Sequence, residues 1–110
     1  MTDARTARIR ALNDAFRQSL SGGGVVTTAG IAAIQADVRG VIVRRVQLFN
    51  AFDADNDPYE EHDFGIFEEH GYKVYWKIDY YNLTMEGGSE DPADPAETTR
   101  VLTIMLAEEY

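Results

Sequence analysis

The chain has 110 residues and carries 10 Lys and Arg against 19 Asp and Glu, so its formal net charge is −9. The length suits one domain, residues 1–110, and the 45% hydrophobic content suits a globular core. The absence of cysteine excludes disulfides, thiolate metal sites and a cysteine nucleophile. The acidic balance argues against direct binding of nucleic acid, which needs excess positive charge. No apolar run is long enough for a membrane span or a signal peptide, so we expect a cytoplasmic protein, and no residue pattern indicates a cofactor.

The charge is divided sharply along the chain. Residues 1–50 carry seven Arg and three Asp, whereas residues 51–110 carry three basic residues and sixteen carboxylates. Internal docking of the basic part onto the acidic part is the simpler interpretation, and an acidic interaction surface is the alternative. Because so small a domain buries a limited core, a homodimer is a further expectation.

An amphipathic helix is predicted near the start of the chain, because apolar residues recur there with helical spacing. These residues are Ile9, Leu12, Phe16 and Leu20. Asp3 can cap the first turn, and the glycines of residues 22–24 favour the end of the helix.

The next segments read as short elements. Residues 25–27 suit a brief strand, and residues 28–34 suit a brief helix capped by Thr28. Residues 37–45 combine helical spacing with a β-branched run. For that stretch we predict a short helix that passes into a strand over residues 46–52.

A β-hairpin is the clearest signal in the sequence. Alternation over residues 72–81 predicts a strand. The residues expected to face the core are Tyr72, Val74, Trp76, Ile78 and Tyr80. Residues 63–68 form the preceding strand, and Gly71 favours a tight turn between the two.

A closing helix is predicted over residues 95–108, begun by Asp94 and Pro95. The expected fold is therefore α+β. It is a small antiparallel sheet of about three strands, with N- and C-terminal helices packed on one face.

Alternating oxygen ligands begin the acidic segment that precedes the hairpin. Asp53, Asp55 and Asp57 resemble the first half of a calcium loop, but Pro58 and Phe64 stand where that loop needs Gly and Glu. A turn in which Asp and Asn side chains bond their own backbone is the favoured interpretation, and a weak calcium site is the alternative.

The same segment offers a cluster that could carry chemistry. It consists of Asp57, Glu61, His62 and Asp63. A histidine beside carboxylates can act as a general base or a metal ligand, which predicts a metal-assisted hydrolase as one candidate function. The competing interpretation is that His62 and Asp63 fix the entry to the hairpin through hydrogen bonds.

One face of the long predicted strand combines basic and aromatic residues. Lys73, Tyr75, Lys77 and Tyr81 alternate there, as in sheets that bind single strands of nucleic acid. The many carboxylates in this half of the chain oppose that function. A covered or partner-binding face is therefore the favoured interpretation.

Several blocks of sequence resemble a family of small bacterial proteins of unknown function that is frequent on plasmids and other mobile elements. The most specific blocks are residues 61–65 (Glu-His-Asp-Phe-Gly) and 76–81 (Trp-Lys-Ile-Asp-Tyr-Tyr), and the others are residues 56–58, 91–95 and 99–110. The resemblance supplies no catalytic residues. It implies a context in which small acidic proteins disarm host defence, as anti-restriction and anti-CRISPR proteins do.

This context gives the acidic half a function. We expect a non-enzymatic inhibitor that binds a basic, nucleic-acid-binding effector complex and blocks its binding of target DNA. Its carboxylates would mimic the regular negative charge of a nucleic-acid backbone. The residues expected to bind the partner are Asp53, Asp55, Asp57, Glu60, Glu61, Glu90, Asp91 and Asp94. A generic protein-interaction module is a further alternative.

Overall fold

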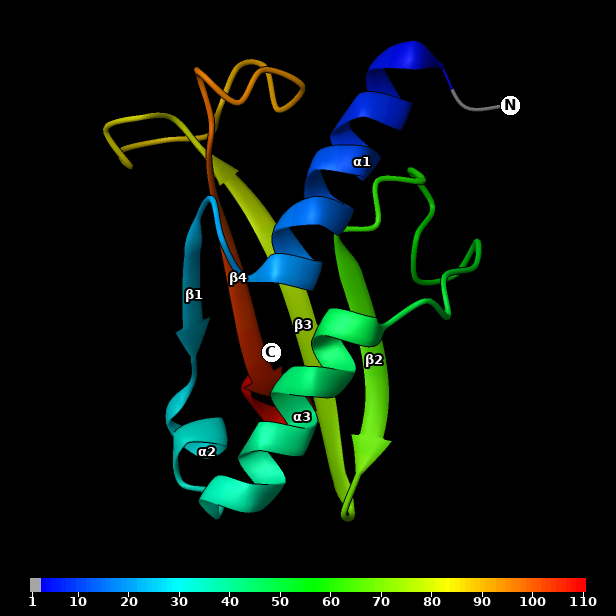
Figure 1. Ribbon diagram of the computed structural model, residues 1–110, viewed down its shortest axis with the longest axis vertical. Helices are drawn as coiled ribbons and strands as arrows, with labels where there is room; N and C mark the ends of the chain where they lie inside the picture. Colours follow the sequence, from blue (N-terminus) through cyan, green and yellow to red (C-terminus); the bar gives the residue numbers. More distant parts are fainter. Residues whose placement is uncertain (1–2) are drawn as a thin grey trace.

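The computed structural model describes residues 3–110, and it confirms the α+β class. The helices are α1 (Ala4–Ser19), α2 (Ala29–Ala32) and α3 (Ala36–Leu48), and a 3-10 turn spans Ala107–Glu109. The strands are β1 (Gly24–Thr27), β2 (Phe64–Glu69), β3 (Tyr72–Tyr81) and β4 (Thr99–Leu106). Figure 1 shows α1 and α3 lying across one face of the sheet. No helix within residues 3–110 is long and apolar enough to cross a membrane.

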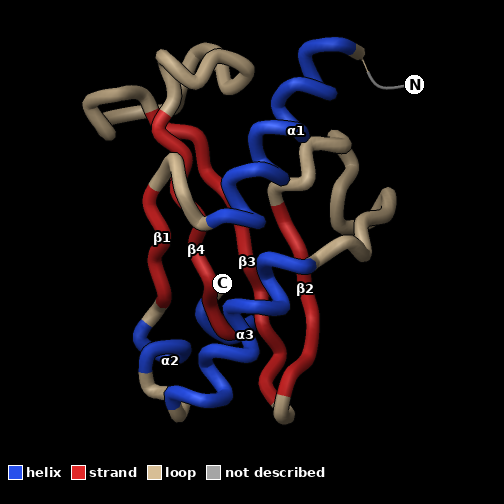
Figure 2. Tube along the Cα trace, in the orientation of Figure 1, coloured by secondary structure: helices blue, strands red, loops and turns tan. Residues whose placement is uncertain are grey.

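The sheet is mixed and has four strands in the order β1-β4-β3-β2. β4 pairs parallel with β1 and antiparallel with β3, and β3 pairs antiparallel with β2. The expected three-stranded antiparallel sheet was therefore wrong in its number of strands and in its direction at β1. Figure 2 shows the last strand of the chain in the middle of the sheet, between the first strand and the hairpin.

The strand predicted over residues 46–52 is wrong, because α3 continues to Leu48 and a loop follows. Ile42, Val46 and Phe49 are buried at helical spacing, and together they cover the sheet. Packing of this apolar stripe outweighs the β preference of the branched residues before it.

The C-terminal helix predicted over residues 95–108 is also wrong. Leu102 and Ile104 are fully buried with an alternating pattern, as in a central strand. This segment pairs on both sides, so the sheet satisfies its backbone groups in a way that the local helical spacing did not reveal. Asp94 bonds the backbone N–H of Ala96 at 2.9 Å in a loop turn instead of capping a helix.

The N-terminal helix is confirmed, including its cap. Asp3 accepts a hydrogen bond from the backbone of Thr6 at 2.7 Å. The helix ends differently from expectation, because Leu20 takes the left-handed conformation with φ 56° in place of a glycine. Asn13 and Arg17 lie on the buried face beside Ile9 and Phe16, so this stripe is partly polar.

The β2–β3 hairpin agrees with the sequence. His70 and Gly71 both have positive φ, 51° and 81°, in the two-residue turn. Val74, Trp76 and Ile78 are buried in the core as predicted, and Tyr80 is half-buried. The prediction was wrong for Tyr72, which is 38% exposed because it lies at the end of the strand beside the turn. The opposite face of the sheet, turned away from α1 and α3, is called the outer face below.

Candidate functional site

Hydrogen bonds between residues of the same loop stabilise residues 50–63. The Asp53 carboxylate accepts the backbone N–H groups of Asp55 and Asn56 at 2.9 and 3.0 Å. The Asn56 amide in turn donates to the carbonyl of Ala51 at 3.0 Å. These contacts agree with the turn interpretation of this segment. Its aspartates form no group of three that could hold a cation within the described residues.

His62 lies between two carboxylates that come from different parts of the chain. Its Nδ1 lies 2.9 and 3.1 Å from the two Asp14 oxygens, and its Nε2 lies 3.7 Å from Asp57 Oδ2. Asp57 is buried and accepts the backbone N–H of His62 at 3.0 Å. The His62 ring stacks on Phe52 with centroids 3.7 Å apart. The imidazole is thus held at Nδ1 and on one face, with the Asp57 carboxylate close to Nε2.

Arg17 extends this arrangement into the core. Its guanidinium is buried, pairs with Asp14 at 3.0 Å and donates to the carbonyls of Val46 and Phe49, each at 3.1 Å. It also lies 5.1 Å from the centroid of the Trp76 ring. Asp14 therefore joins a buried arginine to His62, and α1 to the acidic loop.

A second network surrounds Tyr80. Its hydroxyl donates to Glu61 at 2.7 Å and accepts from Asn13 at 2.7 Å. Burial and the bond to Glu61 raise the pKa of Tyr80 well above its usual range. Arg100 donates to Asn13 at 2.7 Å and to the carbonyl of Pro92, and burial lowers the pKa of its guanidinium. The network fixes both acidic loops to α1.

These contacts separate the four residues of the predicted hydrolase cluster. Asp57 and His62 border one pocket of about 360 Å³ together with Arg10 and Glu60. Glu61 turns away to Tyr80, and Asp63 borders a different hollow. The sequence analysis did not single out Asn13, Asp14 and Arg17 of α1 or Arg100 of β4, because one sequence does not show which polar residues of a helix or strand contact a distant loop.

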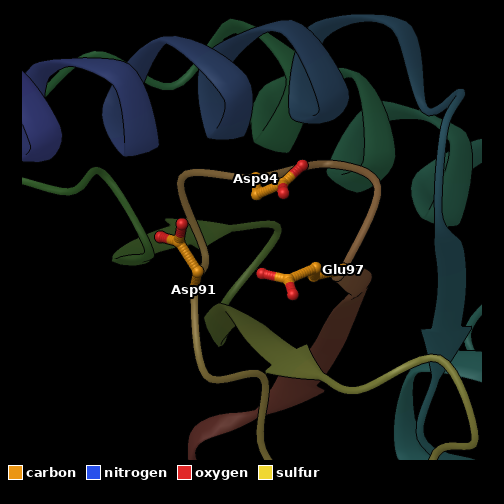
Figure 3. Close-up of side chains that lie close together, drawn as sticks. All are labelled: Asp91, Asp94 and Glu97. Carbon is orange, nitrogen blue, oxygen red and sulfur yellow. The ribbon is translucent and has the colours of Figure 1, made fainter.

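The acidic loop of residues 82–98 carries a compact group of carboxylates. Asp91, Asp94 and Glu97 each place one ligand oxygen within 4.8 Å of the others, and Figure 3 shows them on one turn of the loop. Asp91 pairs with Arg5 at 3.3 Å and accepts the backbone N–H of Ala93 at 3.2 Å. The Asp91 carboxylate therefore already has partners within the described residues.

The arginines of α1 bind the acidic loops. Arg5 pairs with Asp91 at 3.3 Å, Arg8 donates to the carbonyl of Ala93 at 2.8 Å, and Arg10 donates to the carbonyl of Glu60 at 3.1 Å. Internal docking of the basic half onto the acidic half is therefore confirmed for these residues.

The eight carboxylates predicted to bind a partner all lie on the two loops. The loops flank the first half of α1 at one end of the sheet, which is called the acidic end below (Figure 1). Asp53, Asp55, Glu60 and Glu90 are exposed, and Glu61, Asp91 and Asp94 are half-buried. Asp57 is only 5% exposed and serves His62, so its prediction as a surface contact was wrong.

Comparison with known proteins gave a match to one protein family. Residues 27–109 match the family described as "Protein of unknown function (DUF3768)". No curated protein and no solved structure matches the chain. The matched residues include His62, Tyr80 and both acidic loops, and α1 precedes them. The chain belongs to the DUF3768 family.

Proposed function

We propose that this protein is a non-enzymatic inhibitor that uses its acidic end to bind a basic, nucleic-acid-binding defence complex and block its binding of target DNA. The observation that carries the proposal is that two acidic loops, distant in sequence, lie at the same end of the sheet on either side of α1. They expose Asp53, Asp55, Glu60 and Glu90 together. A groove built from Lys and Arg to hold phosphates would accept such a surface.

The nearby arginines leave much of this negative charge available. Arg8 donates to the main-chain carbonyl of Ala93, and Arg17 lies in the core. The exposed carboxylates of Asp55 and Glu90 accept no hydrogen bond from residues 3–110. A field of one sign then extends from this end, and it would steer a basic partner toward it.

The buried networks support the proposal by making the surface rigid. Asn13, Tyr80 and Arg100 fix both loops to α1, and Asp14 with His62 fixes the first loop again. A surface that is already ordered loses little conformational entropy when it binds. The resemblance to proteins of mobile elements agrees with a role against host defence.

The geometry gives the hydrolase alternative less support. An active site needs its groups to converge on one concave site. Only Asp57 and His62 of the four predicted residues share a pocket, and His62 Nδ1 is already bound to Asp14.

The proposal is tested by measuring how the protein inhibits target-DNA binding by purified RNA-guided and restriction complexes. We expect inhibition at a stoichiometric ratio in about 0.1 M salt and its loss in about 1 M salt, where charge interactions are screened within about 3 Å. The double variant D55K/E90K should weaken inhibition by at least about tenfold, because it reverses two exposed charges of the acidic end.

The matched control is E68K/E108K, which makes the same charge change at the opposite end of the sheet on two exposed residues. It should inhibit like the wild type, and circular dichroism should show that both variants fold. Failure of the wild-type protein to inhibit any complex, or equal inhibition by the two folded variants, would contradict the proposal.

A further inference from the structure

The outer face of the sheet is open beside the acidic loop. Phe64 and Lys77 are register partners there, and Tyr110 packs over Phe64 and Tyr75 with ring centroids 5.8 and 5.4 Å apart. Ile66 is 37% exposed on the same face. Polar and aromatic groups therefore reach solvent on this side of β2 and β3.

A hollow of about 610 Å³ lies between this face and the loop, and it is called the outer hollow. Its aromatic walls are Tyr59 from the loop, Phe64 from β2 and Tyr110. Tyr59 and Tyr110 are about three-quarters exposed, so both side chains are accessible to solvent at the rim. Aromatic faces carry negative potential and attract cations.

The outer hollow also carries an excess of negative charge. Four carboxylates border it, those of Asp53, Asp55, Asp63 and Asp79, against one ammonium, that of Lys77. Lys77 Nζ pairs with Asp79 at 2.7 Å, and Asp53 bonds backbone amides of its own loop. The charges of Asp55 and Asp63 remain without a cation among residues 3–110.

Asp63 is the most unusual of these groups. Burial, together with the charges of Glu61, Asp57 and Asp79, raises its pKa to about 6. A half-buried carboxylate surrounded by like charges is destabilised when it ionises, and a cation placed beside it would remove that cost.

We propose that the outer hollow binds an arginine side chain from a basic segment of the partner protein. A guanidinium suits the hollow better than an ammonium does, because it stacks on aromatic rings and donates to carboxylates with a planar fork. This inference rests on the proposed function, since it assigns a recognition pocket to the same acidic partner-binding surface. Charge complementarity favours an arginine as the occupant, because aromatic rings and unpaired carboxylates surround the open space.

The test uses the short peptide acetyl-Gly-Arg-Gly-Arg-Gly-amide and the same peptide with citrulline in place of arginine. Titration followed by ¹H–¹⁵N NMR should shift the amides of Phe64, Lys77 and Tyr110 with the arginine peptide and not with its neutral isostere. D63N should weaken binding by about five- to tenfold, as loss of one charged partner does. E90Q is the matched control, because Glu90 is an exposed carboxylate of the acidic end outside the hollow.

Three results would overturn the inference. The first is equal binding of the citrulline peptide, and the second is equal weakening by D63N and E90Q, which would indicate diffuse attraction. The third is self-association in sedimentation that is lost when residues of the outer face are changed, because a second copy of the chain would then occupy that face. If the arginine peptide binds but the protein inhibits no effector complex, the arginine site is supported and the proposed function is contradicted. If the protein inhibits a complex but the peptide does not bind, only the arginine site is contradicted.

Discussion

Single carboxylates in this molecule differ greatly in what surrounds them. Asp14 lies between the buried Arg17 and His62, so two partners share its charge. Asp63 is half-buried beside other carboxylates, and no residue from 3 to 110 forms an ion pair with it. The first carboxylate stabilises the junction of helix and loop, and the second opposes folding once it is ionised.

Because ionised Asp63 destabilises the folded state, we predict that D63N changes the stability in a pH-dependent way. The folded pKa of about 6 lies above the unfolded value of 3.8, so the folded state holds this proton more tightly. The wild type therefore loses stability as pH rises from about 4 to 6. D63N removes that loss, and its free energy of unfolding should exceed the wild-type value by about 1–3 kcal/mol at neutral pH. Urea denaturation at several pH values measures the difference.

The difference between D63N and the wild type should shrink as pH falls through the range from about 6 to 4 and vanish only below the unfolded pKa of 3.8, where Asp63 is protonated in both states. A constant difference at all pH values would show that packing and not charge is responsible. Destabilisation by D63N at neutral pH would show that the ionised carboxylate has a favourable partner.

For single residues, the sequence predicted the acidic loops and two of the residues that lie together at His62. Asp57 and His62 were both predicted, and they do meet. Asp14 was missed because 48 positions separate it from His62, and its position in a helix gives no sign of the loop that it contacts. Burial of Asp57 was missed for the same reason, since local polarity suggests exposure.

At the scale of elements, the two most specific sequence blocks meet in the hairpin. Gly65 of the first block and Trp76 of the second are register partners across β2 and β3. A Cβ at Gly65 would collide with the Trp76 ring and approach Phe49 within 2.8 Å. The missing side chain of Gly65 thus makes room for the largest fully buried residue.

This contact predicts opposite effects for two glycine substitutions. G65A should lower the free energy of unfolding by about 1–3 kcal/mol or more, because the core must shift to admit a methyl group. G40A should raise it by up to about 1 kcal/mol, since Gly40 lies in α3, is exposed and has open space around it. Thermal or urea denaturation of both variants measures the contrast, and equal stabilities would contradict this account of Gly65.

Strands and helices were predictable where the pattern was local. The alternation of β3 and the cap of α1 required only neighbouring residues, and both are confirmed. The prediction failed at the end of α3 and at β4, where tertiary contacts decide the secondary structure. Val101, Leu102 and Met105 suit a helix by spacing, yet pairing with β1 and β3 makes their segment a central strand.

For the whole molecule, the main feature is the concentration of negative charge at one end. Residues 51–110 hold sixteen carboxylates against three basic residues, and most of these carboxylates lie on the two loops of the acidic end, where they create self-repulsion that α1 relieves only in part. Because this repulsion acts between exposed groups, dissolved salt screens it, with a Debye length of about 10 Å at 0.1 M.

We therefore expect salt to stabilise the fold. Raising sodium chloride from about 0.05 to 0.5 M should raise the urea midpoint, and D55N/E90Q should reduce that gain more than the control E68Q/E108Q. A midpoint that falls with salt would show that the ion pairs of α1 outweigh the repulsion between the loops.

The place of β4 also governs the order in which the molecule can form. The last strand lies between β1 and β3, so neither has its central partner until residues 99–106 are available. Until then the strand that carries Trp76 and Ile78 has one unpaired edge. Because β1 pairs with β4 across a long sequence separation, folding of this chain should be slow for its size.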